Sequence, residues 1–241
     1  MKKIIKKIIK ILKSPFIVPD YLIFKKFHNN RFSIKFADFY PCLKDKTTKT
    51  NFDAHYVYHT AWAARKVKEI NPAIHTDISS SLHFSTIVST FIPINFYDYR
   101  PAELNLSNLK SEHADLTNLD FTDNSLNSLS CMHTIEHIGL GRYGDQIDPE
   151  ADLKAIDELK RVLAKGGSLL FVVPVGKPKI EFNAHRIYSY EQISEYFKDL
   201  TLKEFTLITD DGKYIENADK ELVREQKYGC GCFWFTKKND N

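Results

Sequence analysis

The feature that most constrains the fold is an apolar run, SLLFVV at residues 168–173, which follows a helix-like segment. Such a run is typical of a strand buried on both faces of a parallel sheet. The preceding segment, Pro149–Ala164, carries apolar residues at a 3.6-residue period, which predicts an amphipathic helix. Lys165-Gly166-Gly167 is expected to cap that helix. A helix followed by a fully buried strand predicts an α/β fold.

The rest of the chain continues this alternation. The pattern predicts helices at 53–70 and 82–91, and strands at Ala73–Ile78, Ile94–Tyr97, Glu112–Ala114 and Leu126–Met132. Repeated strand–helix units form a mostly parallel sheet. Two later strands, Leu202–Thr209 and Cys230–Thr236, are expected to form its antiparallel end, with the charged insert Lys213–Lys227 as a solvated helix or loop.

In open α/β sheets, ligands bind outside the carboxyl ends of the strands. That rule selects the polar residues after successive strands, which are Asp77, Ser79–Ser81, Asp98, Asp115, His133–His137 and Pro174–Gly176. The carboxylate of Asp98 suits a ribose diol, because each hydroxyl can donate a charge-assisted hydrogen bond to it. The alternative is that Asp98 only caps its strand or pairs with Arg100.

Four segments in this order resemble the class I S-adenosylmethionine-dependent methyltransferases: HTDISSSLHFS, INFYDYRP, HADLTNLDFTDNSLNSLSCMHTIEHI and AIDELKRVLAKGGSLLFVVPVG. The segment Asp152–Leu169 carries the resemblance most specifically. Within that class the chain is similar to the DUF268-type methyltransferase-like family, over about residues 50–235. The resemblance implies a Rossmann-like fold, S-adenosylmethionine as the cofactor and methyl transfer as the reaction.

The resemblance also implies which residues hold the cofactor. The turn after the first strand approaches the methionine part, the acid after the second strand binds ribose, and the pair after the third strand faces adenine. By position these residues are Asp77 with Ser79, Ser80 and Ser81, then Asp98, then Asp115 with Leu116. His133, which ends the fourth strand, lies beside the reactive methyl group in this alignment.

The turn after the first strand departs from the family pattern. It is glycine-rich in the family, whereas Asp77-Ile78-Ser79-Ser80-Ser81 contains no glycine. A Cβ is strained where φ is positive. The alternative to an enzyme is therefore a degenerate methyltransferase-like domain that acts as a binding or scaffold protein.

The stretch His133-Thr134-Ile135-Glu136-His137 also matches H-x-x-E-H, an inverted zinc-protease signature. A zinc-dependent hydrolase of that type needs both histidines on one helical face and a third protein ligand. No third ligand is evident downstream, so we expect no metal. His133 then faces the pocket as a base, with Glu136 as a second catalytic candidate; the alternative for Glu136 and His137 is that they only hold the loop.

The acceptor is expected to meet residues downstream of this motif. Arg142, in a glycine-rich loop that is expected to be mobile and to cover the pocket, can hold an anionic group. Asn183, His185 and Arg186 follow the fifth strand and can bind a hydroxyl-rich or phosphorylated ligand, with His185 also a catalytic candidate. The alternative is that these three residues cap the helix that starts near Tyr190.

Two upstream histidines are further candidates for binding the acceptor. His55 and His59 lie one helical turn apart, and Trp62 lies one turn further on. That spacing resembles a metal site, but we favour an aromatic wall over the cofactor pocket. Cys230 and Cys232 are too close in sequence for a normal disulfide, and the four scattered cysteines favour free thiols in a reducing cytoplasm.

The N-terminus has a different composition from the rest. Residues 1–14 alternate pairs of isoleucines and lysines, which predicts a basic amphipathic helix suited to an anionic membrane surface. The alternatives are a helix that docks on its own domain or on a partner by the isoleucine face, and a disordered tail. Residues 15–50 form an aromatic-rich extension with one predicted strand at Arg31–Phe36, and residues 51–241 form the methyltransferase-like domain. No run is long and apolar enough to span a membrane.

The formal net charge is +3, from 34 basic and 31 acidic residues, and this balance argues against nucleic acid as a partner. We therefore expect a cytoplasmic enzyme, peripheral on the inner face of the membrane. The family resemblance and the basic helix together favour O-methylation of a sugar or surface-polysaccharide precursor.

Overall fold

The computed structural model describes residues 17–29 and 31–239. The chain separates into two compact units, one that ends at Asn51 and one that begins at Phe52. The predicted basic helix at residues 1–14 lies outside the described residues. Among the helices that are described, none has the length and apolar character needed to cross a membrane.

The first unit contains the helix α2 (Ile17–Phe27) and the short 3-10 helix η1 (Phe36–Asp38). The predicted strand at Arg31–Phe36 is wrong, because residues 31–51 contain no strand and Phe36 begins η1. An alternating pattern forms a strand only where a neighbouring strand can pair with its backbone groups. The aromatic rings pack on one another instead, with the Tyr21 and Phe39 ring centres 5.3 Å apart.

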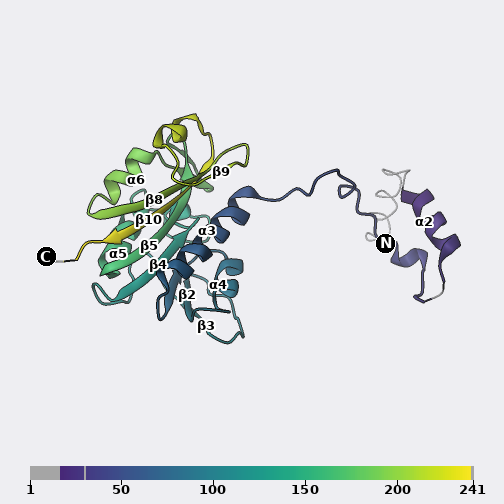
Figure 1. Ribbon diagram of the computed structural model, residues 1–241, viewed down its shortest axis with the longest axis horizontal. Coiled ribbons are helices and arrows are strands. Elements are labelled where there is room, and N and C mark those ends of the chain that lie inside the picture. Colours follow the sequence, from purple (N-terminus) through teal and green to yellow (C-terminus); the bar gives the residue numbers. More distant parts are fainter. Residues whose placement is uncertain (1–16, 30, 240–241) are drawn as a thin grey trace. The chain divides into compact units, whose positions relative to one another are not determined.

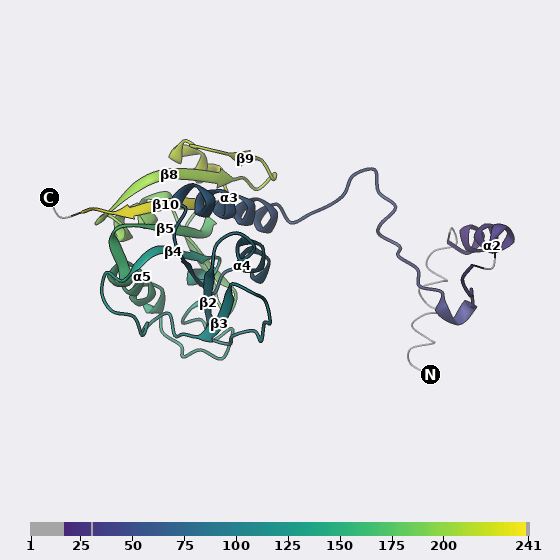
Figure 2. The same cartoon turned by 60° about the horizontal axis from the view of Figure 1, so that its bottom comes forward.

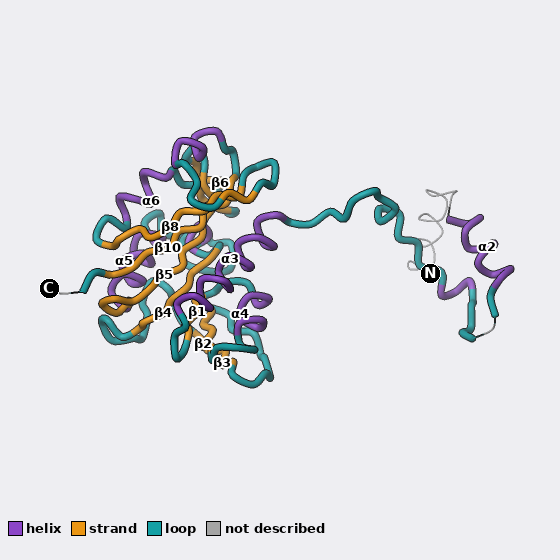
Figure 3. The backbone as a smooth tube through the Cα atoms, viewed as in Figure 1, coloured by secondary structure: helices purple, strands orange, loops and turns teal. Residues whose placement is uncertain are grey.

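The second unit is built around an eight-stranded sheet with the order β3-β2-β1-β4-β5-β10-β8-β9 (Figures 1 and 3). The strands are β1 (His75–Ile78), β2 (Ile94–Asp98), β3 (Leu109–His113), β4 (Leu126–Met132), β5 (Leu163–Val175), β8 (Leu200–Ile208), β9 (Tyr214–Ile215) and β10 (Gly229–Lys237). The first five pair in parallel, whereas β10 is antiparallel to both β5 and β8. This confirms the predicted parallel sheet with an antiparallel last strand.

Helices cover both faces of this sheet (Figure 2). The helices are α3 (Ala54–Ile70) and α4 (Leu82–Val88) on one face, and α5 (Ala151–Val162) and α6 (Tyr190–Tyr196) on the other. In β5, Phe171 and Val173 belong to the core with α5 and α6, while Leu170 and Val172 belong to the core with α3 and α4. Because successive side chains point to opposite faces, a strand covered on both must be apolar throughout.

The ends of several elements follow from local residues. The carboxylate of Asp53 accepts a hydrogen bond from the Tyr56 N–H at the start of α3, and Asn71 ends the helix in the left-handed conformation. The prediction that Lys165-Gly166-Gly167 caps α5 is wrong, since α5 ends at Val162 and these residues lie inside β5. Leu163 is already extended, so the chain passes from helix to strand without a loop.

The edge of the sheet was harder to place from sequence. β3 begins at Leu109, before the predicted start at residue 112, and Leu109 is its one buried side chain. An edge strand with so little buried surface carries little apolar signal. The charged insert Lys213–Lys227 forms β9 and the 3-10 helix η3 (Lys220–Glu225), and a hairpin of β6 (Lys179–Glu181) and β7 (His185–Ile187) follows β5.

Candidate functional site

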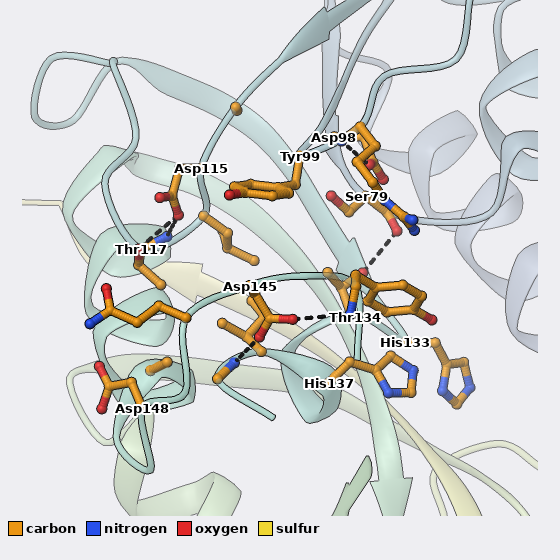
Figure 4. Close-up of a pocket in the computed structure, with 18 residues that line it drawn as sticks. Ser79, Asp98, Tyr99, Asp115, Thr117, His133, Thr134, His137, Asp145 and Asp148 are labelled. Atoms are coloured by element: carbon orange, nitrogen blue, oxygen red, sulfur yellow. Dashed lines mark hydrogen bonds between the residues drawn. The ribbon is translucent and has the colours of Figure 1, made fainter. Parts of the chain in front are cut away.

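Two adjoining cavities, each of about 410 Å³, lie at the carboxyl ends of the parallel strands. The first is lined by residues that follow β1, β2, β3 and β4, among them Asp98, Asp115 and Leu116 (Figure 4). The second is lined by Ser80 and Ser81 and by residues from elsewhere in the chain. These residues are Tyr56, Glu136, Arg142, His185 and Tyr228. Ser79, His133, His137 and Tyr143 line both cavities, so they form the boundary between them.

The serine turn after β1 is well formed. Ser79 has a φ of +57°, in the left-handed region where the family pattern would place glycine. Its N–H donates to the Tyr97 carbonyl at 2.7 Å, and its own carbonyl accepts from the Thr134 hydroxyl at 2.8 Å. The Ser80 hydroxyl accepts from the Met132 N–H at 3.0 Å. Hydrogen bonds to β2 and to the end of β4 thus hold a turn that its own sequence disfavours.

Asp77 lies beneath this turn and lines neither cavity. It is fully buried, and its carboxylate accepts hydrogen bonds from the hydroxyls of Ser130 and Ser85, both at 2.5 Å. Burial raises the pKa of Asp77 to about 6, although these hydroxyl donors oppose the shift. The side chain therefore supports the turn from below, a different position from the cofactor contact that the family alignment implied.

Asp98 and Asp115 occupy opposite sides of the first cavity (Figure 4). Asp98 accepts from the Arg100 N–H through Oδ1 at 2.7 Å, and a carboxylate retains lone pairs for further donors. Asp115 accepts from the N–H and the hydroxyl of Thr117, so it organises its own turn, while the buried Leu116 supplies an apolar wall. A carboxylate beside an apolar wall suits a ligand with a diol and a flat ring.

The H-x-x-E-H stretch is not a helical zinc motif. His133 follows directly after β4 with a φ of +54°, and only Ile135–His137 form a short 3-10 helix, η2. The His133 Nδ1 lies 2.9 Å from a Glu136 carboxylate oxygen, whereas the His137 Nδ1 donates to the Ala184 carbonyl at 2.6 Å. Both imidazoles lie near the same Glu136 oxygen, at 2.9 Å for His133 Nδ1 and 3.8 Å for His137 Nε2. Because His133 precedes η2 and the short 3-10 helix ends at His137, the two histidines do not share one face of an α-helix as an inverted zinc protease requires.

The charge state of His133 follows from its neighbours. Burial alone disfavours an imidazolium here, but Cys230 and Glu136 outweigh it and raise the pKa of His133 to about 10. A histidine that already carries two protons has no lone pair for a third. His133 therefore favours a positive charge at this point more than it favours the role of a base.

His185 is the better placed base in the second cavity. Burial lowers its pKa, although Glu181 and Glu136 oppose the shift, so its neutral form is favoured. Its Nε2 is 3.4 Å from a Glu181 oxygen, but without the geometry of a hydrogen bond. Arg142 lies at the same cavity and donates to the Ala184 carbonyl, next to His137. The imidazole of His185 and the guanidinium of Arg142 thus line the same cavity.

Four of the residues expected to bind the acceptor lie away from both cavities. Arg186 is buried and donates to the carbonyls of Ile138 and Pro149. Its guanidinium also lies 3.5 Å from the Asp152 carboxylate, so it connects the loop after β4 to the start of α5. Asn183 donates to the Leu140 carbonyl. His55 and His59 lie behind the second cavity, against His133. The helix-capping alternative also fails, because Ser189 caps α6 with Gln192.

Sequence reasoning missed the tyrosines of the site. Tyr143 lies between the two cavities, with the guanidinium of Arg100 over its ring at 4.6 Å. Tyr228, just before β10, stacks on His55 with ring centres 5.3 Å apart and lies 4.8 Å from the His185 ring. No motif marks either position, since each residue lies in a loop.

The glycine-rich loop at residues 139–145, which was expected to be mobile, is held by internal hydrogen bonds. Asp145 accepts from the N–H groups of Gly139, Gly141 and Tyr143.

Known proteins share this sequence pattern and fold. The family described as "Caenorhabditis protein of unknown function, DUF268" matches residues 97–213. No curated protein matches the chain. The YcgJ protein from Bacillus subtilis has a TM-score of 0.54 at 12% identity, covering 76% of this chain and 100% of its own.

Two further solved structures are enzymes with S-adenosylhomocysteine bound. The 1,6-didemethyltoxoflavin-N1-methyltransferase from Burkholderia thailandensis has a TM-score of 0.53 at 10% identity, covering 76% of this chain and 79% of its own. The N-methyltransferase NodS from Bradyrhizobium japonicum has a TM-score of 0.52 at 12% identity, covering 76% and 89%. At such identities these likenesses show the fold, and they confirm the expected class I methyltransferase-like fold.

Proposed function

We propose that this chain, which has a class I methyltransferase-like fold, transfers a methyl group from S-adenosylmethionine to an oxygen of a hydroxyl-rich acceptor, such as a sugar or surface-polysaccharide precursor. The observation that supports this most is the first cavity. It lies at the strand ends, it is of small-molecule size at about 410 Å³, and it places Asp98 opposite Asp115 and Leu116.

The residues present fit the cofactor. Asp98 would accept from the ribose hydroxyls, and Leu116 would pack on the adenine ring, with Tyr99 also on the cavity lining. Ser79–Ser81 would face the methionine part across both cavities. When bound, S-adenosylmethionine supplies a methyl group on a positively charged sulfur, which keeps the bonding electron pair when an acceptor oxygen takes the methyl.

The chain's own contribution on the acceptor side is orientation and proton removal. The second cavity adjoins the first at Ser79 and His133, which is where an acceptor oxygen must approach. His185 holds a neutral imidazole there and would take the hydroxyl proton. Arg142 and the tyrosines Tyr56 and Tyr228 would bind a polar, hydroxylated or anionic acceptor.

Calorimetry on the full-length protein tests the donor. We expect S-adenosylmethionine and S-adenosylhomocysteine to bind, and Asp98→Ala to weaken both by about tenfold or more, equivalent to ~1.4 kcal/mol. Asp120→Ala is the matched control, since Asp120 is an exposed carboxylate that lines neither cavity. If neither compound binds, the enzyme proposal fails and the degenerate scaffold protein becomes the better account.

Transfer of a labelled methyl group tests the acceptor. The folded protein is incubated with labelled S-adenosylmethionine and a panel of nucleotide sugars, lipid-linked sugars and small thiols and amines. We expect label in a hydroxylated acceptor, and His185→Gln should lower turnover without changing cofactor affinity. Label in amines or thiols alone would overturn the choice of an oxygen acceptor while leaving the donor intact.

We also propose that the N-terminal unit holds the protein at an anionic membrane surface. Residues 1–14 carry the basic helical pattern, and in the described part of the unit Phe24, Phe27, Phe32 and Phe36 are all at least 60% exposed. Exposed aromatic residues beside Lys25, Lys26 and Arg31 have the composition of an interfacial segment.

Flotation with anionic liposomes tests this proposal. Deletion of residues 1–14 and the pair Phe27→Ser and Phe32→Ser should each reduce the floating fraction. Phe52→Ser is the control, because Phe52 is 55% exposed but belongs to the second unit. Equal flotation of the full chain and both variants would remove the membrane claim.

A further inference from the structure

A group of histidines and cysteines lies between the start of α3, the end of β4 and the start of β10. The ligand atoms of His55, His133 and Cys230 all lie within 4.8 Å of one another. His59, one helical turn after His55, has its ring centre 4.9 Å from that of His133. The Cys232 Sγ lies 3.9 Å from the Cys230 Sγ, because alternate residues of β10 face the same side.

We propose that His55, His133 and Cys230 bind a divalent transition-metal ion of the zinc type, with His59 as the fourth ligand. This histidine–cysteine cluster is a different site from the one that the H-x-x-E-H motif suggested, since it uses His133 but not His137. It also goes beyond the proposed methyl transfer, because metal binding here needs neither the cofactor nor the acceptor.

His59 has a buried ring nitrogen without a hydrogen-bond partner among the described residues. The His59 Nδ1 donates to the His55 carbonyl at 2.6 Å, since a carbonyl can only accept. The lone pair is therefore on Nε2, and this atom is buried without a hydrogen-bond partner among the described residues. The His59 side chain is completely buried. The Nε2 lone pair of a neutral imidazole can bind a metal ion, and here no other group uses it.

The hydrogen-bond partner of His133 also suits a metal ligand. A carboxylate oxygen of Glu136 lies 2.9 Å from the His133 Nδ1, which directs Nε2 towards the Cys230 Sγ at 3.4 Å. Histidine ligands of metals characteristically donate their other N–H to a carboxylate or a carbonyl. His133 has the carboxylate form of this arrangement and His59 has the carbonyl form. A metal ion bound at Nε2 would take the place of the proton there.

The contact between His133 and Cys230 has the length expected in a tetrahedral site. With Zn–S near 2.3 Å and Zn–N near 2.0–2.1 Å, neighbouring ligand atoms of a tetrahedron are roughly 3.3–3.8 Å apart. The observed His133–Cys230 separation of 3.4 Å lies in this range. Mixed imidazole and thiolate ligands select zinc over magnesium or calcium, which prefer oxygen.

A metal-free cluster explains less of the geometry. A thiol of Cys230 that donates to His133 would account for their 3.4 Å contact. It leaves the His59 Nε2 unpaired, and a buried unsatisfied polar group costs about 1–3 kcal/mol. A bound cation satisfies this nitrogen and joins α3 to β4 and β10. It would thereby fix the wall of the second cavity formed by His133.

Metal content measured on untagged, full-length protein tests the proposal. The protein is purified without added metal, stripped with a chelator and reloaded with zinc, and its zinc content and affinity are measured. We expect one zinc per chain. Cobalt in place of zinc should give the thiolate-to-metal absorption and the strong visible bands of a tetrahedral site.

Variants locate the ion. His55→Gln and Cys230→Ala should weaken zinc binding by more than about 100-fold, and Glu136→Gln by about 10- to 100-fold, the loss usual for an outer-shell partner. His83→Gln, an exposed histidine, and Cys131→Ala, a buried cysteine outside the cluster, are the matched controls. Because His55 is only half-buried, its variant keeps the test decisive if Cys230→Ala does not fold.

The outcomes separate this proposal from methyl transfer. No stoichiometric zinc in the reloaded protein, or zinc retained with unchanged affinity in His55→Gln, would overturn the metal site. Calorimetry with S-adenosylhomocysteine on the same samples reports on the cofactor cavity independently. If the protein binds cofactor but no metal, only the metal-site proposal is contradicted. If it binds metal but no cofactor, only the methyltransferase proposal is contradicted.

Discussion

Two buried histidine clusters in the second unit differ in how completely their hydrogen bonds are satisfied. In the first, the His75 ring nitrogens lie 2.7 Å from the Ser128 hydroxyl and 2.9 Å from the Ser130 hydroxyl, and Ser130 donates onward to Asp77. In the second, around His133, Nε2 of His59 and one carboxylate oxygen of Glu136 have no partner within the described chain.

The difference teaches how to separate structural from functional polar clusters. His75, His59, His133 and Glu136 are all buried, so burial of these side chains does not distinguish the two clusters. In the cluster around His75, which we call the closed cluster, every donor meets an acceptor. This cluster is therefore a rigid support for the serine turn above Asp77. In the open cluster, which is the one around His133, two buried acceptor atoms have no hydrogen bond, which is costly unless a cation binds there. The predictions below test this contrast, from the largest expected effect to the smallest.

Breaking the closed cluster should cost the most. His75→Leu keeps a side chain of similar bulk but leaves the Ser128 and Ser130 hydroxyls without their shared partner. Two hydrogen bonds are lost and the Ser128 hydroxyl is left unsatisfied, whereas Ser130 still donates to Asp77. At about 1 kcal/mol for each bond and roughly 1–3 kcal/mol for the unsatisfied group, we expect the free energy of unfolding to fall by about 4 kcal/mol. Urea denaturation measures this, and a loss below about 1 kcal/mol would show that the network contributes little.

Neither cluster could be read from the sequence as a unit, although several of its elements could. The strand Leu126–Met132 was predicted with the bounds that the structure shows, since apolar residues and the polar turn beyond them define it locally. His55 with His59, and Cys230 with Cys232, were each noticed as spacings. They meet only because β10 inserts beside β5 and α3 packs over it, a tertiary fact that no local pattern contains.

The wrong expectations have the same origin. Arg186 was expected to bind a ligand because it follows a strand, but three loop and helix groups use it internally. Asp77 was assigned to the cofactor by alignment, yet two serines from α4 and β4 enclose it. In both cases the neighbours that decide the role come from distant segments. Sequence places residues at the carboxyl edge of the sheet, whereas packing decides which of them face the cavity.

The closed cluster should also show in the pH dependence of stability. The folded pKa of Asp77 is about 6, above the value of about 3.9 for an unfolded chain, so the native state binds more protons between these values. Stability contributed by this group is therefore largest below pH 4 and declines as pH rises through 6, by ~3 kcal/mol.

Asp77→Asn isolates that contribution. The difference in unfolding free energy between wild type and Asp77→Asn should change across pH 4–6 and be level above it. Asp120→Asn, at an exposed carboxylate, controls for the loss of one negative charge. A difference that stays constant across this window would mean that Asp77 ionises normally, and that its burial does not set its charge.

Removing one donor from the closed cluster should have an intermediate effect. Ser85→Ala takes away the hydroxyl that donates to one Asp77 oxygen but leaves the Ser130 donor in place. We expect a loss of about 1–2 kcal/mol at pH 7, together with a higher midpoint for the Asp77 transition, because a hydrogen bond to the charged form is lost. Denaturation curves recorded across pH 4–8 measure both quantities, and an unchanged or lower midpoint would contradict the assigned direction of this bond.

The open cluster should respond least, and this small response is the sharpest test of the contrast. His59→Leu removes the unpaired Nε2 together with the Nδ1–H that donates to the His55 carbonyl, and it puts apolar bulk beside Trp62 and Ala63. In metal-free protein we expect the unfolding free energy to change by less than about 1 kcal/mol, since removing an unpaired buried group is close to neutral. Zinc should then separate the two proteins: at 100 times its dissociation constant it adds about 2.7 kcal/mol to the wild type, and much less to the variant. If His59→Leu instead costs as much as His75→Leu without metal, the two clusters are equivalent structural networks, and the open lone pair carries no function.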